Sequence, residues 1–225
     1  MQSTVPGRHG WVMVFVGFSL SAMSFGGLGT VGVFLKPLIA EFGWSRGETS
    51  LGFSIAALSA AAFGILWGFF ADRQPTRRFL LMAAGALAIA LLLLSQVTVY
   101  WHYLLAYFLF GAFGHAAVAA TVWANIGEWF AQNKGLALGI GLAGSAIGQA
   151  VVPFSARLLI TAHGWQTAYL VLGLIYLVLG LAIAALTRDP PAKSARLAAR
   201  VGRVPDRGAW SLGSAKATVA WFAGA

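Results

Sequence analysis

A few polar side chains that could bind or move a charged group lie within long apolar stretches of the sequence. They are His115, Asn125, Gln149 and Arg157. Removing such groups from water costs free energy, so polar residues inside apolar stretches are candidates for function. An imidazole can carry a proton or donate to an anion near neutral pH. A structural hydrogen bond between helices is the alternative for His115, and a side chain that extends to the membrane interface is the alternative for Arg157.

Ser145, which follows Gly144, suggests a second kind of chemistry, because it could meet His115 as a Ser–His pair. No third group that would orient the histidine is evident, so we expect no enzymatic activity. The sequence contains no cysteine, which excludes disulfides, thiolate metal ligands and cysteine nucleophiles. We expect neither a metal nor a cofactor.

The elements that must position these residues are long apolar helices. The chain has 225 residues, of which 59% are hydrophobic and 9% are charged, against roughly 25% charged residues in a soluble domain. Six apolar runs cover residues 11–35, 49–71, 79–99, 102–126, 135–160 and 166–187. Each run is long enough for a helix that crosses a bilayer. We therefore predict an all-α membrane protein, with a six-helix bundle over residues 1–187 and Lys36-Pro37 ending the first run.

The basic residues give an orientation. The net charge is +9, and the Lys and Arg residues gather in the short segments between apolar runs, which favours a membrane topology over nucleic-acid binding. Only Lys36, Arg46 and Arg157 fall on the side opposite the N-terminus. By the positive-inside rule, both the N-terminus and the tail are predicted to be cytoplasmic. We expect the membrane to be a plasma membrane of the bacterial inner-membrane type.

The tail, residues 188–225, differs in composition from the rest. Its basic residues recur every three or four positions at Lys193, Arg196, Arg200, Arg203 and Arg207. On a helix they would form one stripe that could lie on an anionic leaflet. Gly202 and Pro205 favour instead a basic, partly disordered cytoplasmic linker. The sequence leaves both interpretations open.

The most specific motif lies between the second and third apolar runs. It contains Gly68, Asp72, Arg73, Arg77 and Arg78. Glycine permits close helix approach, and the aspartate offers an acceptor to arginines or to a helix N-terminus. The segment resembles the signature loop of the major facilitator superfamily, G-x-x-x-D-R-x-G-R-R, and departs from it at Pro75 and Thr76. The resemblance implies a conformational latch, while simple topological anchoring of the arginines is the alternative.

Four glycines recur on the predicted fifth helix: Gly135, Gly139, Gly144 and Gly148. The frame Gly135-x8-Gly144-x3-Gly148 resembles the antiporter signature of the same superfamily. Small residues at a spacing of four also serve ordinary helix packing. Both interpretations predict a closely packed fifth helix.

Further stretches resemble the branch of monocarboxylate porters and oxalate/formate antiporters. They are residues 31–38, 41–46, 129–140, 143–148 and 164–169. The resemblance covers about residues 10–187 and implies the N-terminal half of a major facilitator fold, built from two three-helix inverted repeats. It implies a secondary active transporter of a small organic anion, expected to be a carboxylate, that works by alternating access with a missing C-terminal half or a partner half. The alternative is a partner-dependent or non-functional membrane fragment that has no transport of its own.

Overall fold

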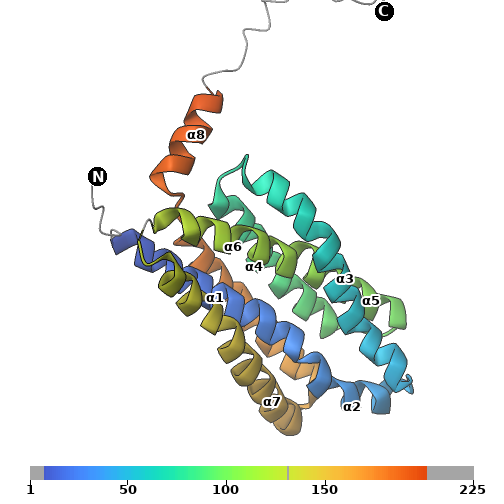
Figure 1. The fold of residues 1–225 in the computed structure, drawn as a ribbon. Helices are drawn as coiled ribbons and strands as arrows, with labels where there is room; N and C mark the ends of the chain where they lie inside the picture. The colour runs from blue at the N-terminus through green and yellow to red at the C-terminus, as the bar shows by residue number, and fades with distance from the viewer. Residues whose placement is uncertain (1–7, 131, 202–225) are drawn as a thin grey trace, which may run out of the picture. The chain divides into compact units, whose positions relative to one another are not determined.

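The computed structural model describes residues 8–130 and 132–201 (Figure 1). All regular secondary structure in these two ranges is helical, so the predicted all-α class is confirmed. The chain divides into two compact units, with the boundary between Pro190 and Pro191. The first unit is a helical bundle, and it contains every candidate site residue named above.

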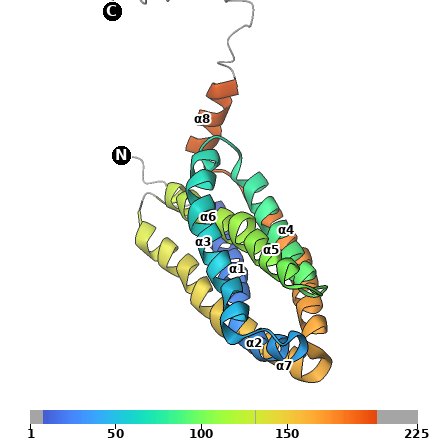
Figure 2. The same ribbon diagram turned by 90° about the vertical axis from the view of Figure 1, so that its right-hand side faces the viewer.

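The bundle is built from long, mostly antiparallel helices (Figures 1 and 2). In chain order they are α1 (Arg8–Gly29), α2 (Val31–Phe42), α3 (Arg46–Ala71), α4 (Thr76–Leu94), α5 (Tyr100–Leu109), the π-helical turn η1 (Phe110–His115), α6 (Ala116–Trp129) and α7 (Lys134–Ala185). Within the described residues, five helical stretches are long and apolar enough to cross a membrane. The longest is α7, whose 52 residues form two arms, so the bundle has the six crossings that the sequence predicts.

The reversal inside α7 occurs at Gly164. Its φ of 81° and ψ of 168° are non-helical, and φ values in this range are readily reached only by glycine. The two arms run in opposite directions from this point, as the views in Figures 1 and 2 both show. The predicted break between the fifth and sixth helices therefore consists of a single glycine hinge rather than a loop.

The first crossing ends later than predicted. Pro37 lies inside α2, and the helix continues to Phe42, where Gly43 caps it with a φ of 68°. The expectation that Lys36-Pro37 ends the first run is therefore wrong. A proline removes one backbone hydrogen bond and bends a helix without always ending it. Here the buried side chains of Phe34 and Leu38 hold α2 against the bundle on either side of the proline.

The next helix begins at a capping box. The hydroxyl of Ser45 accepts a hydrogen bond from the Glu48 backbone N–H at 3.1 Å, and the Ser45 N–H donates to the Glu48 carboxylate at 2.8 Å. These bonds satisfy two backbone donors that a helix start would otherwise leave unpaired. They fix the start of α3 in the short polar segment between the first and second apolar runs.

Small residues let two pairs of helices approach closely. A Cβ added at Gly144 or Gly148 of α7 would lie 2.1 or 2.0 Å from a backbone oxygen of α1. A Cβ added at Gly111 of η1 would lie 2.1 Å from the Ala56 oxygen of α3. Gly144 and Gly148 thus bring the fifth crossing against the first, and Gly111 brings the fourth crossing against the second. When crossings one to three and four to six are taken as two sets, the first member of each set meets the second member of the other. This exchange of contacts is the pattern expected of two related three-helix repeats.

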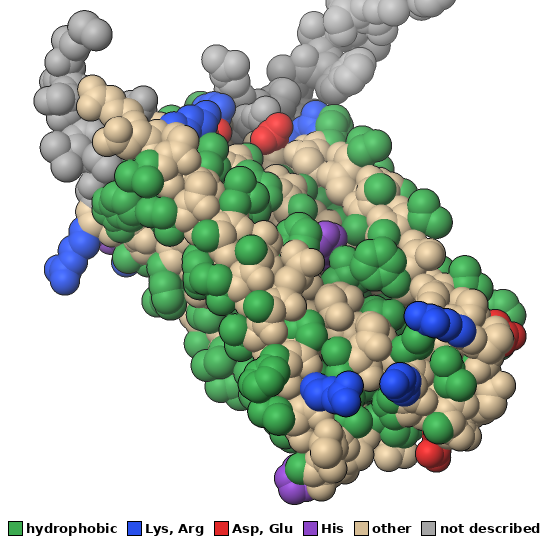
Figure 3. Space-filling view, turned by 60° about the horizontal axis from the view of Figure 1, so that its bottom comes forward, with side chains coloured by type: hydrophobic (Ala, Val, Ile, Leu, Met, Phe, Trp, Pro, Cys, Tyr) green, Lys and Arg blue, Asp and Glu red, His purple; other side chains and the backbone are tan. Residues whose placement is uncertain are grey.

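The outer surface of the bundle is largely apolar. Figure 3 shows hydrophobic side chains spread over one face, with Lys and Arg side chains gathered toward its ends. On α3, Leu58 and Ile65 are 71% and 80% exposed. Such a band of apolar side chains is unfavourable in water and suits contact with lipid or with another apolar surface.

The second unit contains α8 (Pro191–Val201). The tail is thus helical from Pro191 to Val201, and the choice between a membrane-lying basic stripe and a linker stays a prediction. Residues 202–225, including Arg203 and Arg207, lie outside the described residues.

Candidate functional site

The turn that carries His115 passes close to α3. Gly111 permits this approach because any larger side chain would meet Ala56. The indole Nε1 of Trp67, on α3, donates to the Ala112 oxygen at 2.6 Å. Single π-helical turns are often found at functional sites, and this one sets the rotation of the helix that presents His115.

The His115 side chain is anchored by α1. Its Nδ1 lies 2.7 Å from the Ser24 hydroxyl, and the Phe25 ring meets the imidazole edge-on with 4.6 Å between centroids. Ser24 is fully buried and the bond itself is partly buried, so it fixes the imidazole orientation. The structural hydrogen bond between helices that the sequence offered as an alternative is therefore present.

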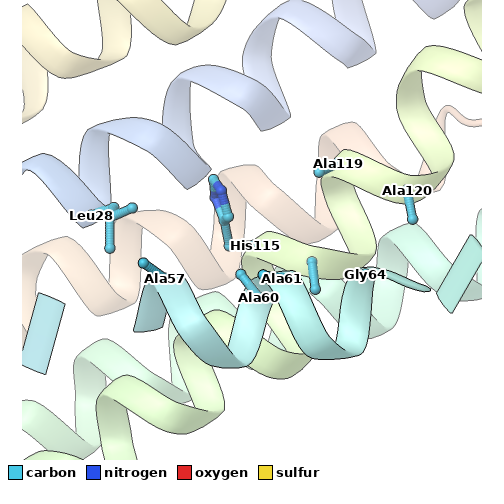
Figure 4. A pocket seen from close by; sticks show the side chains of 9 residues that line it. Leu28, Ala57, Ala60, Ala61, Gly64, His115, Ala119 and Ala120 are labelled. Carbon is cyan, nitrogen blue, oxygen red and sulfur yellow. The ribbon is translucent and has the colours of Figure 1, made fainter. Parts of the chain in front are cut away.

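The same histidine also lines a cavity of about 440 Å³ between α1, α3 and α6. Its other lining residues are small or apolar: Leu28, Ala57, Ala60, Ala61, Gly64, Ala116, Ala119 and Ala120 (Figure 4). Ala57 and Ala61 are exposed, so the cavity opens at the surface of the bundle. Among these lining residues, His115 is the one with a titratable side chain.

Asn125 lies elsewhere, at the end of the bundle where α1 and α4 begin and α3 and α6 end. We call this end, which carries Arg8, Arg73, Arg77, Arg78 and Arg188, the basic end. The Asn125 amide donates to the Thr76 hydroxyl at 3.2 Å and to the Arg188 oxygen at 3.3 Å. Its side chain is buried and joins three helix ends, which is a structural arrangement.

Gln149 and Arg157 are exposed on the first arm of α7, and neither is among the residues that line the His115 cavity. The Gln149 side chain passes near Gly29 of α1 and bonds weakly to the Ser145 oxygen of its own helix at 3.5 Å. Of the four polar candidates, the structure therefore brings only His115 to this cavity.

The loop between α3 and α4 presents its charges outward. Asp72 caps the end of α3, and Asp72, Arg73, Arg77 and Arg78 are all exposed. The Arg73 guanidinium folds back over the Phe69 ring, with 3.4 Å from Cζ to the centroid. At Gly68 an added Cβ would meet no atom within 4 Å. Close packing at Gly68 is therefore not seen against the described residues.

The four glycines of α7 separate into two pairs. Gly144 and Gly148 contact the α1 backbone at Phe18 and Ala22, whereas an added Cβ at Gly135 or Gly139 would meet open space. The first arm of α7 therefore packs closely against α1 along its middle section.

The Ser–His pair does not form. The Ser145 hydroxyl donates to the Leu142 oxygen of its own helix at 2.7 Å, while His115 bonds to Ser24. A serine nucleophile requires a base within hydrogen-bond reach, so these residues do not form a catalytic pair in this conformation.

Sequence reasoning missed Ser24 and Asp189. Ser24 carries a hydroxyl inside an apolar run. A polar group inside an apolar run is also the signal that identifies His115, so Ser24 could have been found in the same way. Asp189 caps α4 from 113 residues away, and no local pattern in the sequence indicates such a contact.

The helical bundle, with its apolar surface and long crossings, is that of an integral, multi-pass membrane protein. Residues 14–224 match the Major Facilitator Superfamily, and the chain belongs to that family.

Three curated relatives illustrate the similarity. The chain is 30% identical over 200 residues to the riboflavin transporter RibJ of Trypanosoma brucei brucei, covering 82% of this chain and 35% of the relative. It is 30% identical over 192 residues to a protein of Cupriavidus necator named "Probable sulfoacetate transporter SauU", covering 82% and 44%. It is 25% identical over 191 residues to monocarboxylate transporter 11 of Homo sapiens, covering 83% and 41%. The chain thus spans less than half the length of these relatives.

Proposed function

We propose that this chain forms part of a secondary active transporter that moves a small organic anion, of the carboxylate class, by alternating access. The observation that carries the proposal is the His115 cavity, where one fixed imidazole faces a wall of alanine and glycine. Ligand sites are typically apolar cavities of roughly 300–1,000 Å³ with a few placed polar groups. A cavity of about 440 Å³ fits a small ligand.

The bond to Ser24 supports a role of His115 in binding. When the Ser24 hydroxyl donates to Nδ1, the neutral imidazole carries its proton on Nε2 and can donate it to a carboxylate oxygen. A charged acceptor makes such a bond stronger than one between neutral groups. The names of the sulfoacetate and monocarboxylate transporters among the relatives support an anionic substrate.

A second apolar bundle is proposed to complete the transport unit. The cavity opens at the surface, and a polar imidazole facing lipid there would be unfavourable. The exposed side chains of α3 offer an apolar surface for such a bundle. In this arrangement the loop containing Asp72 and Arg73 acts as the latch between bundles, and the basic end faces the cytoplasm. A fragment that binds but does not transport remains the second candidate, favoured by the short coverage of the relatives.

Binding and transport can be tested separately on the purified chain. In nanodiscs, tryptophan fluorescence is titrated with small carboxylates, including sulfoacetate and lactate, and with their neutral amides as matched ligands. We expect carboxylates alone to bind, and His115→Phe, which keeps an aromatic ring beside Phe25, to weaken binding at least tenfold, as loss of one charge-assisted hydrogen bond does. Equal binding of amides, or no effect of His115→Phe, contradicts the anion site.

Uptake is then measured in vesicles that contain only this polypeptide. We expect no radiolabelled carboxylate to accumulate above empty vesicles, because one bundle cannot close the cavity on both sides. Sustained uptake by the chain alone contradicts the need for a second bundle and leaves the binding result unaffected.

A further inference from the structure

A second cavity, of about 350 Å³, lies at the basic end, between the start of α1, the start of α4 and the end of α7. It shares no lining residue with the His115 cavity. Its polar lining consists of His9, Arg77, Thr187 and Arg188, and the remaining lining residues are apolar. Two guanidinium groups and an imidazole thus surround one space.

Arg188 and His9 are held in place by neighbouring elements. The Arg188 backbone N–H donates to the Met13 sulfur at 3.3 Å, which fixes the chain against α1. Its Nη1 donates to His9 Nε2 at 2.8 Å. Because an arginine only donates, His9 accepts at Nε2 and presents its ring N–H at Nδ1. His9 in turn stacks on Trp129, with 6.5 Å between ring centroids.

The acidic group nearest in sequence is already engaged. Asp189 follows Arg188, but its carboxylate accepts hydrogen bonds from the backbone and hydroxyl of Thr76. None of the residues that line the cavity is acidic. The two arginine charges are therefore not neutralised by the cavity lining, and Thr187 adds a buried hydroxyl with no hydrogen-bond partner among the described residues.

The chemistry that fits this arrangement is a phosphate oxyanion. The planar, forked donors of arginine match phosphate oxygens two at a time. The cavity also has apolar walls and lies at the ends of membrane-crossing helices, close to Trp129, where tryptophans and headgroups meet. A phosphate at this position could be supplied by an anionic phospholipid or by free phosphate.

We propose that the cavity bounded by His9, Arg77 and Arg188 binds a phosphate group, and that the bound group bridges the start of α4 to the end of α7. The site is independent of the transported substrate, because it lies at the basic end and not at the His115 cavity. Arg77 thereby gains a role besides the predicted latch.

The test uses the full chain in two arms. In the lipid arm, the protein is extracted from nanodiscs of phosphatidylcholine with phosphatidylglycerol, and bound lipid is counted by native mass spectrometry. In the phosphate arm, the detergent-purified protein is titrated with inorganic phosphate, and binding is followed by thermal shift. Binding in the first arm alone identifies a lipid headgroup, and binding in the second alone identifies free phosphate; either result supports the site.

Matched variants connect binding to the cavity. We expect Arg77→Gln and Arg188→Gln each to weaken phosphate or phosphatidylglycerol binding by about tenfold, and Arg188→Lys, which keeps the charge without the fork, to weaken it less. Arg46→Gln removes the same charge at the opposite end of the bundle and should change nothing. If Arg188→Gln does not fold, the exposed Arg77 decides the test through Arg77→Gln.

Two outcomes overturn the proposal. One is that neither phosphatidylglycerol nor phosphate binds the wild-type chain. The other is that Arg77→Gln binds them as tightly as Arg46→Gln does, which would place any bound anion outside this cavity.

Discussion

The Asp189 carboxylate caps the N-terminus of α4, although it lies 113 residues further along the chain. It accepts hydrogen bonds from the Thr76 N–H at 3.0 Å and from the Thr76 hydroxyl at 2.5 Å. The residue before Thr76 is Pro75, whose side chain cannot cap a helix. A negative charge at a helix N-terminus is favourable. Asp189, which follows α7, therefore provides the N-terminal cap that the local sequence of α4 lacks.

Removing this cap should destabilise the bundle. Asp189→Asn and Thr76→Val are each expected to lower the free energy of unfolding in detergent by about 1–2 kcal/mol, the usual cost of losing a helix cap. Because the two residues contact each other, the double variant should lose less than the sum of both. Asp72→Asn serves as the charge control and should leave stability nearly unchanged, since Asp72 is exposed. Additive losses would show that the two residues act separately.

Helix contact at Gly144 can be tested by adding one methyl group. Gly144→Ala would place a Cβ against the Phe18 backbone, and we expect a loss of about 1–3 kcal/mol, as for other overpacked positions. Gly139→Ala is the matched control on the same helix, where space is open. It should be neutral or stabilise by up to about 1 kcal/mol. Thermal unfolding of both variants in the same detergent provides the comparison, and equal melting temperatures would contradict the packing described.

Ser24 is expected to influence anion binding through His115. Ser24→Ala removes the hydrogen bond that orients the imidazole, so carboxylate affinity should fall several-fold, less than for His115→Phe. Ser145→Ala is the control, because the Ser145 hydroxyl bonds only within its own helix turn. The readout is the fluorescence titration in nanodiscs. If Ser145→Ala lowers carboxylate affinity as much as Ser24→Ala does, the Ser24–His115 hydrogen bond has no specific role in binding.

Orientation in the membrane can be read from single cysteines, because the sequence has none of its own. Gln74→Cys and His163→Cys place a thiol at exposed positions at opposite ends of the bundle. If the basic end is cytoplasmic, an impermeant maleimide should label His163→Cys in intact cells and Gln74→Cys only after lysis. The reverse pattern would invert the proposed topology.

The sequence predicted the crossings well because most of the apolar runs end near charges, glycine or proline. It failed at Pro37, since helix continuation there depends on Phe34 and Leu38 packing against other helices. The candidate site was predicted only in part. His115 reaches a cavity, whereas Asn125 joins helix ends and Gln149 and Arg157 face outward. The rotation of each helix decides which face is buried, and local sequence does not specify that rotation.

The chain reverses direction at the single residue Gly164, so no loop separates the two arms of α7. One arm is held against α1 by Gly144 and Gly148, and the other packs along α4 near Gly173, where an added Cβ would meet Leu92. A tilt of α1 that carries the first arm with it must pull on the second, because no flexible connector absorbs the displacement. The reversal at Gly164 thus links the crossing that contacts α1 directly to the crossing that contacts α4.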